Sequence, residues 1–127
     1  MMHIYSSVVI VSDQDAALDF YVGKLGWEVR QDNQMSPDYR FLAVAPPGHS
    51  TAIVLGPPHI HGRPAPTPDA PVFSDIYLMS DDVPADFARL SALGVAFDQE
   101  PEPMPWGGFG ARFHDVDGNV FFVSDAG

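Results

Sequence analysis

The same order of apolar and polar segments occurs twice along the chain. Residues 5–11 and 72–79 are apolar runs rich in β-branched and aromatic residues, which is typical of strands. A Ser-Asp pair follows each run, at Ser12-Asp13 and at Ser80-Asp81. Short polar side chains at such a position can accept hydrogen bonds from the first turn of a helix. The repeated order indicates two diverged copies of one unit.

The segments 14–25 and 84–93 have helical periodicity. Apolar residues recur in each at spacings that place them on one face of a helix. A Leu-Gly pair closes both segments, and Gly26 and Gly94 can adopt the left-handed conformation that ends a helix. We therefore predict one amphipathic helix in each half.

Three further strands are predicted after each helix. They lie at 27–30, 41–44 and 51–55 in the first half, and at 95–97, 111–114 and 120–124 in the second. The Asp-Gly-Asn sequence at 117–119 favours a tight hairpin, because glycine and asparagine tolerate positive φ. Each half therefore has the order β-α-β-β-β.

The segment 56–71 is predicted to be a linker between a first module, 1–55, and a second module, 72–127. Six of the thirteen prolines lie in it, and proline removes the amide donors that a sheet interior requires. A half of this size would bury too little surface alone. We therefore expect residues 1–127 to form a single domain.

Composition narrows the functional classes. The absence of cysteine excludes disulfides, thiolate metal sites and a thiol nucleophile. A formal net charge of −11 opposes binding to nucleic acids and anionic membranes, and is compatible with a cationic or neutral small molecule. Neither a secretion signal nor an apolar run of about 18 residues is evident, so we expect a cytoplasmic protein.

Three stretches resemble the vicinal oxygen chelate superfamily, the glyoxalase/bleomycin-resistance/dioxygenase group. They are residues 8–27, Pro105-Trp106-Gly107 and 113–123. The resemblance implies an α+β fold in which two βαβββ modules form a cupped mixed β-sheet around a pocket, usually completed in a homodimer. In the enzymes of the family, His, Glu or Gln side chains on four strands hold a divalent metal in that pocket.

Carried over by motif spacing, the four metal-ligand positions fall on residues that are poor ligands. They are Ser6, Ala52 or Val54, Asp75 and Phe122. Among these residues only Asp75, through its carboxylate, could coordinate a metal strongly. A metal site needs three or four ligands. Shifting the opening strands by one residue gives Ser7 and Ser74, which are no better. We therefore predict no family metal and no cofactor.

The histidines provide no evident replacement for the missing metal ligands. His59 and His61 are two residues apart and would point the same way in an extended segment, but no third ligand has a suitable spacing. We expect His3 to be a partly exposed strand residue and His114 to support the turn beside Asp115. A general-base role for His114 would require it to face the pocket.

Alternation along the strands predicts an apolar pocket lining. The inward set is Ser6, Val8, Val54, Asp75, Tyr77, Met79, Val120 and Phe122, and the loop 104–109 adds Trp106 and Phe109. From these, the predicted ligand-binding residues are Ser6, Val54, Asp75, Tyr77, Trp106, Phe109 and Phe122. Such a pocket suits a flat or partly apolar molecule, or a cation attracted by the carboxylate and the ring faces.

Each of these residues also has a structural interpretation. Val54, Phe122, Tyr77 and Met79 can be core residues, and Trp106 can pack across a dimer interface. A buried carboxylate needs partners, and Arg40 or Arg112 could pair with Asp75.

Three functions are therefore open. The first is metal-independent binding of a small molecule, as in drug-sequestering members of the superfamily, by a homodimer that is not an enzyme. The second is a lyase, isomerase or dioxygenase with an unusual or metal-free site. The third is a structural or regulatory dimer with a closed pocket.

Overall fold

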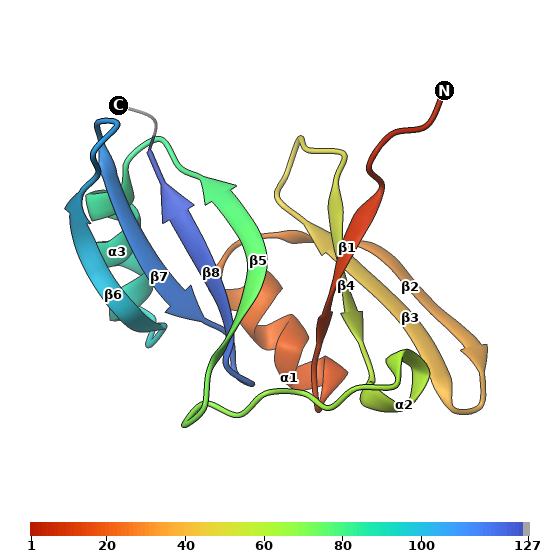
Figure 1. Ribbon diagram of the computed structural model, residues 1–127. Helices are drawn as coiled ribbons and strands as arrows, with labels where there is room; N and C mark the ends of the chain where they lie inside the picture. The colour runs from red at the N-terminus through yellow and green to blue at the C-terminus, as the bar shows by residue number, and fades with distance from the viewer. Residues whose placement is uncertain (126–127) are drawn as a thin grey trace. The chain divides into compact units, whose positions relative to one another are not determined.

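Each half of the chain forms a four-stranded mixed sheet (Figure 1). The computed structural model describes residues 1–125, which divide into two compact units, 1–66 and a second that begins at Thr67. In the described part of the chain, no helix is long and apolar enough to cross a membrane.

The first unit contains five residues of α-helix followed by a π-helix, four strands and a short second helix. These are β1 (Ser6–Ile10), α1 (Gln14–Leu18), η1 (Asp19–Lys24), β2 (Glu28–Ser36), β3 (Tyr39–Ala45), β4 (Ala52–Gly56) and α2 (Pro58–His61). The strand order is β1-β4-β3-β2, with β1 parallel to β4 and the other pairs antiparallel.

The second unit repeats this plan. Its elements are β5 (Val72–Met79), α3 (Val83–Ala92), β6 (Ala96–Pro103), β7 (Phe109–His114) and β8 (Asn119–Ser124). The order β5-β8-β7-β6, with a parallel β5–β8 pair, matches that of the first unit. The predicted α+β class and the duplicated β-α-β-β-β order are confirmed.

The helix caps differ slightly between the two units. Asp13 caps α1 as predicted, because its Oδ1 accepts hydrogen bonds from the amides of Asp15 and Ala16 at 2.9 and 3.1 Å. In the second unit the cap is Asp82 and not the Ser80-Asp81 pair, since the Asp82 carboxylate accepts from the amide of Ala85 at 3.0 Å.

The first predicted helix changes type midway. Residues 14–25 were expected to form one amphipathic helix, but after Leu18 the backbone widens into the π-helix η1. The amide of Leu25 donates to the carbonyl of Phe20 at 3.0 Å, a π-type bond that spans five residues. Both Phe20 and the adjacent Tyr21, which lie in this widened turn, are buried.

Several boundaries also differ from the predictions. β2 and β6 extend to Ser36 and Pro103, because backbone pairing with β3 and β7 continues through polar residues that carry no apolar signal. The proline-rich segment contains the single-turn helix α2, which starts with a proline and ends at Gly62 in the left-handed conformation.

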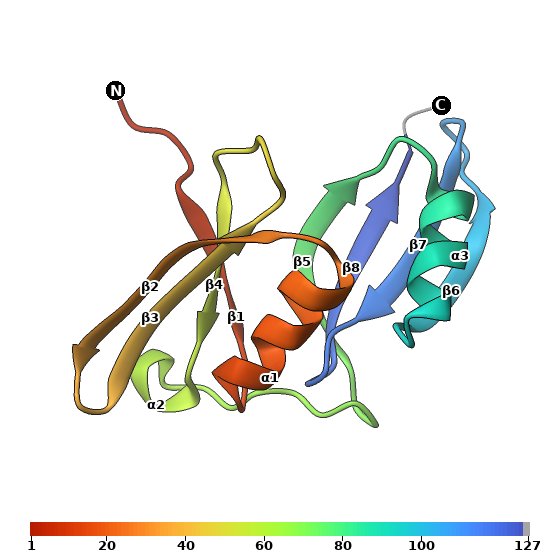
Figure 2. The ribbon, with the colours of Figure 1, turned by 180° about the vertical axis from the view of Figure 1, so that it is seen from behind.

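The two faces of the second sheet are different. A chain of ring contacts links Phe87 on α3 to Phe97, then to Phe113 and Phe121, with centroid distances of 4.8, 5.6 and 5.6 Å. Figures 1 and 2 show α3 lying along this face. Because strand residues alternate, Arg112 and Phe122 point to the opposite face. Within residues 67–125 no helix covers that face, which we call the open face.

The predicted hairpin between β7 and β8 is confirmed. The Asp115 carboxylate accepts hydrogen bonds from the amides of Asp117 and Asn119 at 3.0 and 2.9 Å, which closes the turn. Gly118 has a φ of +95°, and its Cα faces the carbonyl of Thr67 so closely that a Cβ would collide with it.

Substitution of Gly118 by alanine is expected to destabilise the protein by about 1–3 kcal/mol, because the new Cβ combines a strained φ with a backbone clash. Denaturant unfolding measures this change. The matched control is Gly23→Ala in η1, where a Cβ meets nothing within 4 Å. The control should be neutral or slightly stabilising. Equal effects of the two variants would contradict the clash.

The Asp125 carboxylate joins two elements of the second unit. It accepts from the amide of Val83 at the start of α3, at 2.7 Å, and from the amide of Phe109 at the start of β7, at 2.6 Å. These hydrogen bonds, first that from Phe109 and then that from Val83, favour the charged form and lower the pKa of Asp125.

The stability that Asp125 contributes should therefore be complete at neutral pH and be lost as the pH falls through its lowered pKa. We expect Asp125→Asn to lower the Tm at neutral pH and to flatten the fall in Tm between about pH 5 and about pH 2. Thermal unfolding across this range measures both effects. Glu100→Gln, at an exposed position on β6, should change neither. An unchanged acid limb in Asp125→Asn would show that Asp125 does not contribute.

Candidate functional site

Aromatic side chains and one arginine gather on the open face of the second sheet. The Tyr77 ring contacts those of Phe73 and Phe122 edge to face, with centroids 5.5 and 5.8 Å apart. The guanidinium carbon of Arg112 lies 5.0 Å from the Phe73 centroid and 5.8 Å from that of Phe122. Tyr77 is 70% exposed. We call Phe73, Tyr77, Met104, Arg112 and Phe122 the aromatic face.

A glycine allows the floor of the aromatic face to form. A Cβ on Gly110 would lie 2.7 Å from the Met104 terminal methyl and 2.8 Å from the Phe122 ring, so both side chains rest on the bare backbone of β7. Met104 adds a polarisable thioether that adapts to neighbouring rings.

A bulge in β5 sets the positions of Phe73 and Tyr77. Phe73 pairs with Val120 and Tyr77 with Phe122, so β5 takes four steps where β8 takes two. Ser74 replaces the lost backbone pairing, since its Oγ donates to the carbonyl of Val120 at 2.6 Å and accepts from the amide of Ile76 at 3.2 Å. The regular pairing assumed for this strand is therefore interrupted between Phe73 and Tyr77.

Asp75 lies at the bulge, with a φ of +62° and its side chain exposed. Within residues 1–125 its carboxylate makes no ion pair or hydrogen bond. The expectation that Arg40 or Arg112 pairs with it is wrong. Arg40 binds Asp15 and Asp32, both at 2.8 Å, and Arg112 contacts rings. The Arg40 hydrogen bond lowers the pKa of Asp32, so this pair supports the fold of the first unit.

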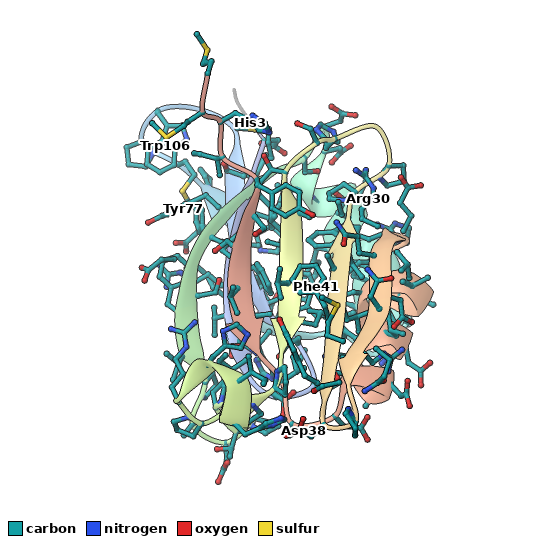
Figure 3. The ribbon with its side chains drawn as sticks, turned by 90° about the vertical axis from the view of Figure 1, so that its right-hand side faces the viewer. His3, Arg30, Asp38, Phe41, Tyr77 and Trp106 are labelled. Carbon is teal, nitrogen blue, oxygen red and sulfur yellow. The ribbon has the colours of Figure 1, made fainter. Side chains whose placement is uncertain are left out.

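The loop between β6 and β7 carries two exposed rings. Hydrogen bonds from Gly107 to the carbonyl of Met104 and from Met104 to the carbonyl of Gly108, both 3.0 Å, close it into a tight turn. Trp106 at its tip is 64% exposed, and Phe109 follows it. Tyr77 and Trp106 both project outward from the ribbon in Figure 3.

The predicted site residues of the first unit have a different environment. Ser6 pairs with Ala52, and Val8 with Val54, in the parallel β1–β4 ladder. Val54 is buried in a cluster of small side chains, against which Val8 and Phe41 pack; its other members are Ala43, Ala45 and Ala52. Phe41 is labelled in Figure 3. The structure thus brings Tyr77 together with Phe122, and places Ser6 and Val54 in the other unit.

The residues at the family's metal-ligand positions do not fit a metal. Ser6, Ala52, Val54 and Phe122 offer no carboxylate or imidazole, and Asp75 is exposed on a bulge. Within residues 1–125, no group of three or more His, Asp or Glu side chains is arranged to hold a metal ion.

His59 and His61 point in different directions, contrary to prediction, because they lie on the helix α2 and not on an extended segment. The Nε2 of His59 contacts the carbonyl of Asp38 at 2.7 Å. The His61 ring lies against Gly56, and no polar atom among residues 1–125 forms a hydrogen bond with its buried Nε2. His3 is exposed and precedes β1, so the expectation of a strand position for it is also wrong.

His114 forms a pair that the sequence did not reveal. Its Nδ1 lies 2.9 Å from both carboxylate oxygens of Asp98 on the neighbouring strand β6. His114 was expected to support the turn beside Asp115, whereas it contacts a residue sixteen positions earlier. The pair depends on an irregularity in the β6–β7 register between Phe97 and Gln99, which no spacing in the sequence indicates.

Comparison with known proteins places these features in a family. A crystal structure of a superfamily member from Sphaerobacter thermophilus is 40% identical, with 98% of each chain covered and a TM-score of 0.89. TnmS3, an antibiotic binding protein from Streptomyces sp. CB03234, is 37% identical over 100% of this chain and 98% of its own, with a TM-score of 0.83. The uncharacterised YetH of Bacillus subtilis is 32% identical over 92% of both chains.

The model of one family matches residues 3–123, which is nearly the whole chain. The resemblance drawn from residues 8–27 and 113–123 is thereby confirmed. The protein belongs to the Glyoxalase/Bleomycin resistance protein/Dioxygenase superfamily.

Proposed function

We propose that the protein binds a flat, partly apolar small molecule without a metal and holds it unchanged. The observation that supports this proposal is the aromatic face. There the exposed ring of Tyr77 contacts those of Phe73 and Phe122 edge to face, and the guanidinium of Arg112 lies over the Phe73 ring. Exposed rings on a fixed sheet give a planar ligand a large contact area at small entropic cost. The likeness to TnmS3, an antibiotic binding protein, supports the same function.

Sequestration requires affinity and no catalytic group. This agrees with the residues at the family's metal-ligand positions, which do not fit a metal. Tyr77, Trp106, Phe109 and Phe122 are the ring contacts that we assign to the ligand. Ser6, Val54 and Asp75 remain predicted contacts. Of these, Val54 is buried in the first unit, and Asp75 is exposed at the bulge of β5.

The Asp98–His114 pair favours a second candidate function, metal-free acid–base catalysis. A carboxylate that binds Nδ1 orients an imidazole so that its Nε2 can accept a proton. The two candidates differ in what happens to the bound molecule. Recovery of an unaltered ligand after prolonged incubation supports binding, and a chemically changed product supports the enzyme.

We also propose that the protein is a homodimer. β5 is an edge strand of its sheet and carries the exposed apolar side chains of Val72 and Met79, the latter 69% exposed. Exposed apolar side chains on an edge strand favour pairing with a second chain. Light scattering after gel filtration measures the mass, and a monomer at micromolar concentration would contradict the proposal. The cytoplasmic location stays a prediction.

Binding is tested with phenylnaphthylamine, a neutral aromatic dye whose emission rises in apolar surroundings. We expect saturable binding that Tyr77→Ser weakens about tenfold, because a ring contact contributes about 1–1.5 kcal/mol. Tyr5→Ser removes an exposed tyrosine in the first unit and should leave the Kd unchanged. Fluorescence titration gives both values. No saturable binding by the dye or by its anionic analogue would overturn the proposed function.

Metal independence has its own test. Dialysis against a chelator should leave the Kd for phenylnaphthylamine and the Tm unchanged, because the carried-over positions supply no ligand set. Elemental analysis of the protein as purified is the companion measurement. Near-stoichiometric nickel, zinc, iron or manganese would contradict this part of the proposal.

A further inference from the structure

Arg112 differs from three other arginines of the chain in its contacts. Arg30, Arg40 and Arg89 each pair with a carboxylate within 3.4 Å. Arg112 is half-buried on the open face and makes no ion pair or hydrogen bond within residues 1–125; its recorded contacts are the ring faces of Phe73 and Phe122. In a chain with seventeen acidic and six basic residues, a half-buried guanidinium without a carboxylate is unusual.

The geometry of Arg112 leaves its donors available. Ring contacts engage the flat face of a guanidinium, while its five N–H groups lie in the plane and point outward. This planar fork matches two oxygens of an anion. Because a guanidinium is weakly hydrated, little binding energy is lost when a ligand displaces its water.

A second polar group lies on the same face. His114 is two residues from Arg112 along β7, so both side chains point to the open face, at a spacing of roughly 6–7 Å. Asp98 binds the Nδ1 of His114 through both oxygens at 2.9 Å. The Nε2 of His114 is left without a protein partner in the described residues, so it can meet a ligand.

We propose that the aromatic face binds a planar aromatic anion, whose charged oxygens are held by Arg112 and reach toward the Nε2 of His114. The ligand class is an aromatic ring system bearing a carboxylate, sulfonate or phenolate. This inference rests on the proposed binding function. It assigns the ligand a negative charge, whereas the carboxylate of Asp75 was expected to attract a cation. The arginine is fixed among the rings, whereas Asp75 is exposed on the bulge of the edge strand β5.

The test uses two dyes with the same rings, anionic anilinonaphthalenesulfonate and neutral phenylnaphthylamine. We expect the anion to bind at least about tenfold more tightly, since a hydrogen bond to a charged group contributes at least this factor. Arg112→Met keeps the apolar stem and should abolish the preference, so that the two dyes bind with nearly equal affinity. Arg112→Lys, with charge but no fork, should retain part of it.

Arg89→Met, on the exposed surface of α3 in the same unit, is the matched control and should keep the full preference. Far-ultraviolet circular dichroism and Tm establish that each variant is folded. Equal affinities for the two dyes would overturn the anion proposal and leave the binding function intact. A preference that survives in Arg112→Met would overturn the assignment to this residue. Failure of both dyes to bind would overturn the binding function and the inference together.

Discussion

The parallel pairing of the first and last strands of each unit is the constraint on which the rest of the structure depends. Parallel neighbours cannot be joined by a short hairpin, so the chain must cross over the sheet between them. In the second unit this crossover carries α3, which packs its Phe87 against Phe97. One face of that sheet is therefore committed to the core, and the opposite face is left for side chains that the helix does not cover.

The alternation of β7 and β8 divides residues between these two roles. Phe113 and Phe121 stack on the helix side, and their sequence neighbours Arg112 and Phe122 lie on the open side. The side chains that stabilise the unit are thus distinct from those proposed to bind the ligand. We expect substitutions on the open face to have little effect on the core, because the residues proposed to bind a ligand lie on a scaffold that other side chains stabilise.

The sequence was sufficient for the fold because its signals there are local. Local signals fix nearby stretches of backbone: the apolar runs, the capping aspartates and the Asp-Gly-Asn turn. The duplication indicated the order of helices and strands along the chain. The family resemblance added the overall plan. Tyr77 and Phe122, both assigned to the pocket lining, are in ring contact.

The sequence failed where geometry depends on distant pairing. The bulge in β5 leaves Asp75 outside the backbone pairing with β8, and the turn of α2 separates His59 from His61. The Asp98–His114 contact follows from the register of two paired strands, and the ring contacts of Arg112 from three strands. None of these relations has a fixed spacing along the chain, so periodicity could not reveal them.

The β5 bulge has a further consequence for the two rings on either side of it. Because Ser74 satisfies the backbone across the irregular stretch, the strand absorbs two additional residues while Tyr77 onward returns to regular pairing. Because the excess is an even number of residues, Phe73 and Tyr77 keep the same phase on either side of the bulge. The two rings therefore meet on one face of the sheet although they are four positions apart along the chain.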